Sequence, residues 1–243
     1  MKFKTPDPFP KWRAAFTLVE MLVVIAIISI LMTLGSVGLS SVGSKGVTSA
    51  VATAEALFDE AHNNAVGRNL RTAVLVAKTL TNNPAEDLRR MVVVYEETDA
   101  DGAPKEPDNE SPNWVLSSRG ATLPEKTFFS SRYSKLNHSS GSGDIPTIPH
   151  TQLKRGTSAV RQAYYGEWYL YEFNSQGIAK NPGASFVVGN GVRPLTQSAE
   201  EKPPRVAGSA KRDFGGFIIW RNGRTSVFRN PDQMGLPSTI SDF

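Results

Sequence analysis

A long apolar run near the N-terminus constrains this chain more than any other feature. Residues 22–34 read LVVIAIISILMTL, and the apolar character extends back to Phe16 and, more weakly, forward to Leu39. This segment of roughly 24 residues makes about 36 Å of helix, which is enough to cross a hydrocarbon core of about 30 Å. We expect residues 16–39 to form the transmembrane half of an N-terminal helix.

The net charge of the chain is concentrated before this apolar run. Residues 1–15 hold a net charge of +3 out of +4 for the whole chain, from Lys2, Lys4, Lys11 and Arg13 against Asp7. Basic residues that flank a membrane span stay on its cytoplasmic side. We therefore expect residues 1–15 to be a basic leader peptide, followed by a single pass through the inner (cytoplasmic) membrane. The C-terminal domain is then on the exported, periplasmic side.

One carboxylate, Glu20, lies inside the apolar run. A charge at the centre of a span costs about 2.5–3.5 kcal/mol, and such residues usually have a function and a partner. Three simpler interpretations compete with an exported, anchored protein. A cleaved secretory signal has a shorter apolar core, a plain signal anchor leaves Glu20 unexplained, and a buried core helix leaves the basic leader unexplained. The Glu20 side chain could also simply extend to the interface.

The stretch Ala15-Phe16-Thr17-Leu18-Val19-Glu20 resembles the signal of type IV pilins and pseudopilins. In that family a short basic leader ends in glycine and is followed by Phe-Thr-Leu-[Ile/Val]-Glu and a long apolar helix. The resemblance implies cleavage between Ala15 and Phe16 by prepilin peptidase, and then N-methylation of Phe16. Ala15 stands where the family usually has glycine, which puts the efficiency of cleavage in question.

The resemblance also gives Glu20 a role in assembly. Glu20 follows Phe16 by four residues, which is about one helical turn on the same side. In the family, this glutamate is thought to neutralise the terminal amine of a neighbouring subunit, so that two desolvated charges pair. The implied partners are other pilin or pseudopilin subunits, prepilin peptidase, a membrane assembly platform and membrane lipid.

Residues 40–70 have the pattern of an amphipathic helix. Apolar residues recur at spacings of three and four, which is one stripe of a helix. They are Val47, Val51, Ala54, Phe58, Ala61 and Ala65. No proline separates this part from the apolar run, so one helix from Phe16 to about Arg68 is possible. We expect a bend or a frayed turn at Gly35, Gly38, Gly43 and Gly46, and we interpret His62 as a residue of the helix surface.

Residues 71–243 are predicted to form a β-rich globular domain. Segments rich in β-branched and aromatic residues predict strands at 72–77, 91–95, 168–173, 185–188, 214–220 and 224–228. Asn222-Gly223 predicts a tight hairpin between the last two strands, and residues 174–177 predict a turn. Residues 97–112 and 134–156 are interpreted as surface loops. The predicted fold class is α+β, with the long helix packed on an antiparallel sheet, as in the pilin fold.

The stretch AEALFDEAHNNAVGRNLRTAVLVA resembles the minor pseudopilins of the GspH/FimT type. In that group the helix ends in an alanine-rich segment, and an Arg-Asn turn leads into the first strand. The later stretches FNSQGIA and GGFIIWRNGRTSVF are similar to the group's turns and closing hairpin. The resemblance implies a structural subunit, and more specifically a minor one, of a type II secretion pseudopilus or of a type IV pilus.

Catalytic and metal-binding interpretations find little support in the sequence. The chain has no cysteine, and its histidines lack metal-ligand spacing. In Asp99-Ala100-Asp101-Gly102 the glycine comes fourth, whereas a calcium loop of the EF-hand type needs it sixth, so a solvated acidic turn is favoured. No nucleophile–base arrangement stands out. We expect a protein that is not an enzyme, without cofactor or metal.

A DNA-binding role is the alternative function. Some proteins of the FimT type bind DNA for uptake, and Arg212, Arg221 and Arg224 lie in or beside the C-terminal hairpin. Clustered arginines can bind phosphates, but a solvated basic face is the simpler interpretation. The part after the leader is nearly neutral, and residues 99–110 are acidic. We therefore do not expect nucleic acid as a partner.

The N-terminal signal predicts a defined mature end. Mass spectrometry of the membrane-extracted protein should find a chain that begins with N-methylated Phe16. Ala15→Gly should preserve or accelerate cleavage, whereas a bulky charged residue at 15 should block it. A mature N-terminus near Ser41 or Ser44 would instead establish a conventional secretory signal.

Overall fold

The computed structural model describes residues 18–105, 112–206, 213–237 and 240, except for the side chains at 29–45 and 231. The chain divides into two compact units, residues 1–41 and residues 42–243. Helix α1 begins in the first unit and ends in the second, and the strands belong to the second. The second unit has the predicted α+β composition.

Helix α1 covers Leu18–Arg68, a length of 51 residues. The predicted single helix is therefore confirmed from Leu18 onward, while Phe16 and Thr17 lie outside the described residues. The predicted frayed turn is wrong, because residues 35–46, with their four glycines, are helical. Each glycine costs roughly 1 kcal/mol relative to alanine but, unlike proline, keeps its backbone hydrogen bond. Asn69 follows the helix with a left-handed φ of 55°, a common helix end.

The second half of α1 buries one face against the sheets. All six residues of the predicted stripe are buried, which confirms it: Val47, Val51, Ala54, Phe58, Ala61 and Ala65. Ala50 and Leu57 widen the buried face. The helix approaches the sheet closely at Gly215, where a Cβ atom would come within 2.9 Å of Val47.

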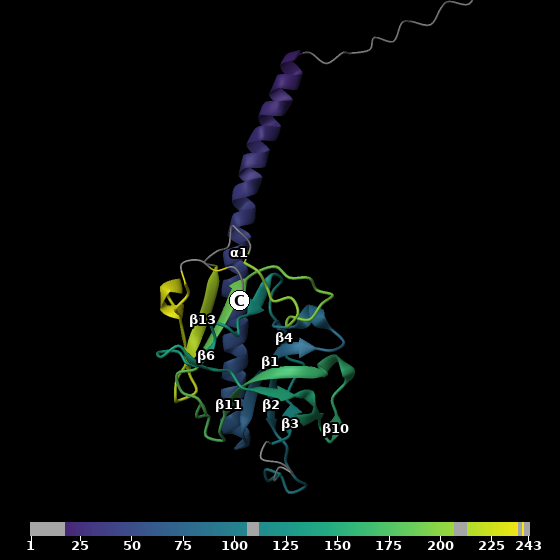
Figure 1. Cartoon of the computed structure of the whole chain (residues 1–243), viewed down its shortest axis with the longest axis vertical. Coiled ribbons are helices and arrows are strands. Elements are labelled where there is room, and N and C mark those ends of the chain that lie inside the picture. The colour runs from purple at the N-terminus through teal and green to yellow at the C-terminus, as the bar shows by residue number, and fades with distance from the viewer. Residues whose placement is uncertain (1–17, 106–111, 207–212, 238–239, 241–243) are drawn as a thin grey trace, which may run out of the picture. The chain divides into compact units, whose positions relative to one another are not determined.

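A sheet of eight strands, called the larger sheet below, forms one layer of the second unit. Its spatial order is β10 (Ser158–Ala159), β9 (Leu153–Arg155), β3 (Trp114–Leu116), β2 (Arg90–Glu96), β1 (Thr72–Leu80), β11 (Gly166–Phe173) and β8 (Thr147–Pro149), with β4 (Ala121–Thr122) paired to β2. The pairs are antiparallel except β3 with β9. Strand β1 lies between β2 and β11 (Figure 1).

A sheet of four strands, called the smaller sheet, has the order β14 (Thr225–Val227), β13 (Phe214–Ile219), β12 (Ser185–Asn190) and β5 (Thr127–Phe129). Strands β6 (Lys135–Asn137) and β7 (Ser142–Asp144) form a separate hairpin. Short 3-10 helices are η1 (Pro84–Glu86), η2 (His150–Gln152), η3 (Gln162–Tyr164) and η4 (Pro231–Met234).

All six predicted strands are present, with ends shifted by at most three residues. The loop predicted at 134–156 is wrong, because that stretch contains β6, β7, β8 and β9. These strands are three residues long and rich in Ser, Gly, Pro and charge, so local composition does not reveal them. Strands β8 and β9 form because they pair with β11 and β3.

The main core lies where the second half of α1 meets both sheets. The Phe58 ring is fully buried. It makes edge contacts with Tyr171 of β11 at 5.2 Å, Phe186 of β12 at 5.6 Å and Phe217 of β13 at 5.0 Å between ring centroids. Such pairs contribute roughly 0.5–1.5 kcal/mol beyond the burial of their area. One helix residue therefore contacts both sheets.

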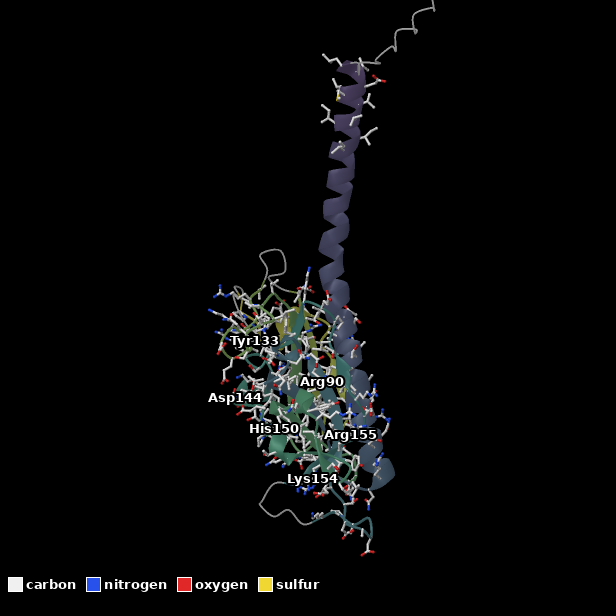
Figure 2. All side chains as sticks on the ribbon, turned by 90° about the vertical axis from the view of Figure 1, so that its right-hand side faces the viewer. Arg90, Tyr133, Asp144, His150, Lys154 and Arg155 are labelled. Carbon is white, nitrogen blue, oxygen red and sulfur yellow. The ribbon has the colours of Figure 1, made fainter. Side chains whose placement is uncertain are left out.

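A second core lies on the other face of the larger sheet. Along β1, Val74 and Val76 belong to the main core, whereas Leu75 and its neighbours Ala73 and Ala77 belong to the second. Residues 147–165 cover this face and contribute Ile148, Leu153 and Tyr164, which pack with the buried Trp114 and Trp168. Figure 2 shows part of this cover, from His150 to Arg155. Both faces of the sheet are thus shielded from water.

The second unit should fold without the apolar part of α1. A fragment of residues 44–243 keeps the buried face of α1, so we expect it to be soluble, monomeric and β-rich with one helix. Circular dichroism and size-exclusion chromatography test this. An aggregated or unfolded fragment would show that the helix–sheet packing depends on residues before Ser44.

Replacement of Phe58 by alanine should destabilise this fragment strongly. Removing a fully buried phenylalanine costs about 3–5 kcal/mol, because the transfer energy is lost and a cavity remains. Urea unfolding followed by tryptophan fluorescence measures the loss. Val66→Ala is the matched control on the same helix, since Val66 is 55% exposed and its truncation should change stability by about 0.5 kcal/mol or less.

Candidate functional site

The beginning of α1 is the most unusual surface of the described chain. Nine large apolar side chains between residues 18 and 28 are 44–80% exposed. They are Leu18, Val19, Met21, Leu22, Val23, Val24, Ile25, Ile27 and Ile28. These side chains project from the ribbon on both sides in Figure 2. A helix that is apolar all round needs a hydrophobic surrounding, either a membrane or other protein.

Glu20 interrupts this apolar surface. It lies in the first turn of α1 and is exposed. The free backbone N–H groups at a helix N-terminus favour a negative charge there by about 0.3–1 kcal/mol. Ala15 and Phe16 lie outside the described residues, so the cleavage site and the methylated residue remain predictions. The role of Glu20 in assembly also remains a prediction.

The predicted membrane span, residues 16–39, lies partly outside the described residues, because it includes residues 16 and 17 and the side chains at 29–39. Among the residues that the structure describes, no helix combines the length and the apolar content needed to cross a membrane.

The predicted C-terminal hairpin is confirmed, since β13 pairs with β14. The Gly223 N–H donates to the Trp220 carbonyl and the Trp220 N–H to the Arg224 carbonyl, both at 2.9 Å. Gly223 has a φ of 74°, as expected at the left-handed position of a hairpin loop. Arg221 and Arg224 are exposed on either side of Asn222-Gly223, while Arg212 lies outside the described residues.

Two carboxylates of α1 lie beside the hairpin. Arg224 Nη1 is 4.0 Å from Asp59 Oδ1, and both side chains are largely exposed, so this pair contributes little stability. Thr225 Oγ1 donates a hydrogen bond of 3.1 Å to Glu55 Oε1. These negative charges reduce the attraction of the arginines for a phosphate.

His62 is not a simple surface residue, contrary to the prediction. It is half-buried, and its Nδ1 donates to the Gly177 carbonyl at 3.0 Å. The turn at 174–177 is confirmed by the bond from Gly177 N to Asn174 O. A Cβ atom at Gly177 would collide with the His62 ring. A Cβ atom at Gly223 would collide with the His62 ring and with the Gly177 carbonyl. His62 thus holds two glycine turns against the end of α1, a contact between distant residues that helix periodicity does not reveal.

The other candidate ligands have structural partners. His138 Nε2 donates to the Gln233 carbonyl and His150 Nδ1 to the Gly166 carbonyl. Asp99 Oδ1 accepts from the backbone N–H groups of Asp101 and Ala103, which is the geometry of a capped turn. Within the described ranges, no three His, Asp or Glu residues lie close enough to hold a metal ion.

One polar feature that the sequence does not predict is a buried ion pair. Asp87 and Arg193 have fully buried side chains with their charged atoms 3.6 Å apart. Asp87 also accepts from the backbone N–H groups of Leu80 and Ala199, and Arg193 donates to the carbonyls of Pro84 and Gln197. Burial raises the pKa of the Asp87 carboxyl and lowers the pKa of the Arg193 guanidinium. The partners are 106 positions apart, so no local pattern predicts the pair.

Comparisons with known proteins support the N-terminal signal. A family model described as the prokaryotic N-terminal methylation motif matches residues 13–36. No curated protein and no solved structure matches the chain. The motif suggests a type IV pilin-like substrate of prepilin peptidase, and it indicates a structural subunit rather than an enzyme. The finer resemblance to minor pseudopilins of the GspH/FimT type stays a prediction.

The arginines of the hairpin should not bind DNA at physiological salt. The nearby Asp59 and Glu55 repel phosphates, and the chain beyond the leader is almost neutral. An electrophoretic mobility shift of duplex DNA with the 44–243 fragment tests this. A shift at low micromolar protein that Arg221→Ala with Arg224→Ala abolishes would contradict the prediction, and each lost phosphate contact should then lower the salt slope by about 0.9.

Proposed function

We propose that this chain is a membrane-anchored structural subunit of a pilus-like filament, most similar in role to a minor pseudopilin. The single observation that carries the proposal is the exposed apolar helix at residues 18–28 with one carboxylate, Glu20, in its first turn. The match of residues 13–36 to the methylation motif supports it.

The apolar helix serves the subunit twice. Before assembly its exposed side chains are covered by lipid, because contact with water would cost about 25 cal/mol for each Å² of apolar surface. In the filament the same side chains are covered by the helices of neighbouring subunits. The positive leader stays in the cytoplasm, so the second unit is exported to the periplasmic side of the inner membrane.

Glu20 gives the assembly its polarity and register. Cleavage before Phe16 creates a terminal amine one helical turn from the carboxylate. In an apolar surrounding an unpaired charge is costly. Removing one partner of a buried ion pair therefore destabilises the structure by several kcal/mol. The terminal amine of one subunit therefore pairs with the Glu20 carboxylate of another. A wrong axial offset between the two subunits leaves both buried charges unpaired.

The partners follow from this arrangement. They are other pilin or pseudopilin subunits, prepilin peptidase, the membrane assembly platform and lipid. A minor subunit of a type II secretion pseudopilus or of a type IV pilus is the role we favour, and it rests on the similarity of residues 54–77 and of the closing hairpin to GspH/FimT sequences.

DNA uptake is the second candidate function, and the exposure of Arg221 and Arg224 on one hairpin is the observation in its favour. Asp59 beside Arg224 weakens it. We therefore place the structural role first.

Loss of the Glu20 carboxylate should impair assembly and leave earlier steps intact. Glu20→Ala should be exported and cleaved normally, but it should be depleted from sheared filaments or cross-linked tip complexes, because the terminal amine of a neighbour lacks its partner. Glu20→Asp should retain part of the incorporation, since the charge remains on a shorter side chain.

Glu60→Ala is the matched control, because Glu60 lies on the same helix outside the apolar segment. Quantitative immunoblots of membrane and filament fractions measure the effect. Equal incorporation of the Glu20→Ala and Glu60→Ala variants would show that charge pairing is not needed for assembly.

A further inference from the structure

The loop between β12 and β13 presents two aliphatic side chains to solvent. Val192 is 57% exposed and Leu195 is 49% exposed. They are three residues apart and so at most about 11 Å apart. Single exposed aliphatic residues are common, but here two lie close together on one loop.

The loop cannot turn these side chains inward. Arg193, which lies between them, is buried in the ion pair with Asp87, and Ala199 further along donates to the same carboxylate at 2.9 Å. The backbones of Val192 and Arg205 exchange two hydrogen bonds. Breaking a buried pair of this kind would leave an uncompensated buried charge, so Val192 and Leu195 stay outside.

The loop lies at the end of the second unit where α1 enters it. The Gly191 N–H donates to the Lys126 carbonyl at 2.8 Å, and Asn190 pairs with Thr127. A Cβ atom at Gly46 would lie 3.4 Å from the Thr127 side chain. In Figure 1 the loop follows this edge of the second unit.

A short stretch of chain links this end of the unit to the apolar segment. Six residues lie between Leu39 and Gly46, and the seven steps from one to the other span about 25 Å when fully extended and about 10 Å when helical. The headgroup layer outside a hydrocarbon core is roughly 5–8 Å thick. A connection of this length allows the loop to reach the bilayer surface.

We infer that Val192 and Leu195 dock the second unit onto the bilayer before the subunit enters a filament. This inference rests on the proposed membrane anchor. The docking is apolar, because the exposed charges described nearby carry both signs: Glu125, Lys126, Glu200, Glu201, Lys202 and Arg205. The loop is released when the subunit leaves the membrane.

Site-specific fluorescence in vesicles tests the docking with the full chain. The chain has no cysteine, so Val192→Cys and Leu195→Cys each allow one environment-sensitive label. The protein is reconstituted at low density in vesicles of phosphatidylethanolamine and phosphatidylglycerol that contain a nitroxide on the lipid headgroup. We expect the nitroxide to quench both labels, and quenching to persist in high salt.

Two further labels serve as controls. Val66→Cys places a label on a valine of similar exposure, 55%, about 30 Å along α1 from Gly46, and it should not be quenched. Val23→Cys reports on the anchor and should be quenched by a nitroxide on the acyl chain. Adding Leu195→Asp to Val192→Cys should reduce quenching at 192 to the level at 66.

The possible failures are distinct. If the labels at 192 and 195 are quenched no more than the label at 66 while the label at 23 is quenched, the docking is overturned and the anchor stands. If the label at 23 is not quenched, the anchor and the docking both fail.

A blue shift at 192 that grows with protein density, without quenching by lipid, would assign the loop to a neighbouring subunit and overturn the inference. Loss of quenching in high salt would overturn apolar docking.

Discussion

The packing of Phe58 between two sheets is the interaction on which the second unit depends. Its ring contacts Tyr171 in the larger sheet and Phe186 and Phe217 in the smaller sheet. The smaller sheet has few strands and two short edges, so it needs the helix to cover its face. Because one helix residue joins both sheets, the fold cannot lose α1 and keep its core. The alanines before and after Phe58 matter for the same reason, since small side chains let the helix approach closely.

The two halves of α1 differ in how their apolar side chains are shielded from water. From Val47 to Ala65 the helix has one apolar face, and the sheets cover it. From Leu18 to Ile28 the apolar side chains surround the helix, and the described part of the chain leaves them exposed. A single continuous helix therefore contains two kinds of segment. The apolar face of the second half is covered by its own chain, whereas the apolar side chains of the first half require lipid or other protein to cover them. Under the proposed function, folding of the domain and assembly of a filament would use different residues of one element.

The sequence predicted the parts of the structure that leave a local signal. The stripe from Val47 to Ala65 was found from its helical period of 3.6, and six strands were found from their β-branched and aromatic residues. The short strands β3, β8 and β9 were missed because they exist through pairing with distant strands. The half-buried state of His62 and the ion pair between Asp87 and Arg193 were missed for the same reason, since they join residues far apart in the chain. At the candidate site, the motif around Phe16 and Glu20 was recognised from sequence, whereas the position of Asp59 beside Arg224 required the fold.

The contact of α1 with both sheets also has a mechanical consequence. The buried face extends from Val47 to Ala65, and at its end His62 holds the turns at Gly177 and Gly223. A force applied along the axis of α1 would act on all these contacts at once, in shear, instead of opening them one after another. Rupture in shear requires many contacts to fail together, so the domain would resist a pull on its helix far better than a sideways pull on a sheet edge. Such a domain would keep its fold while its helix is drawn or pushed along the axis.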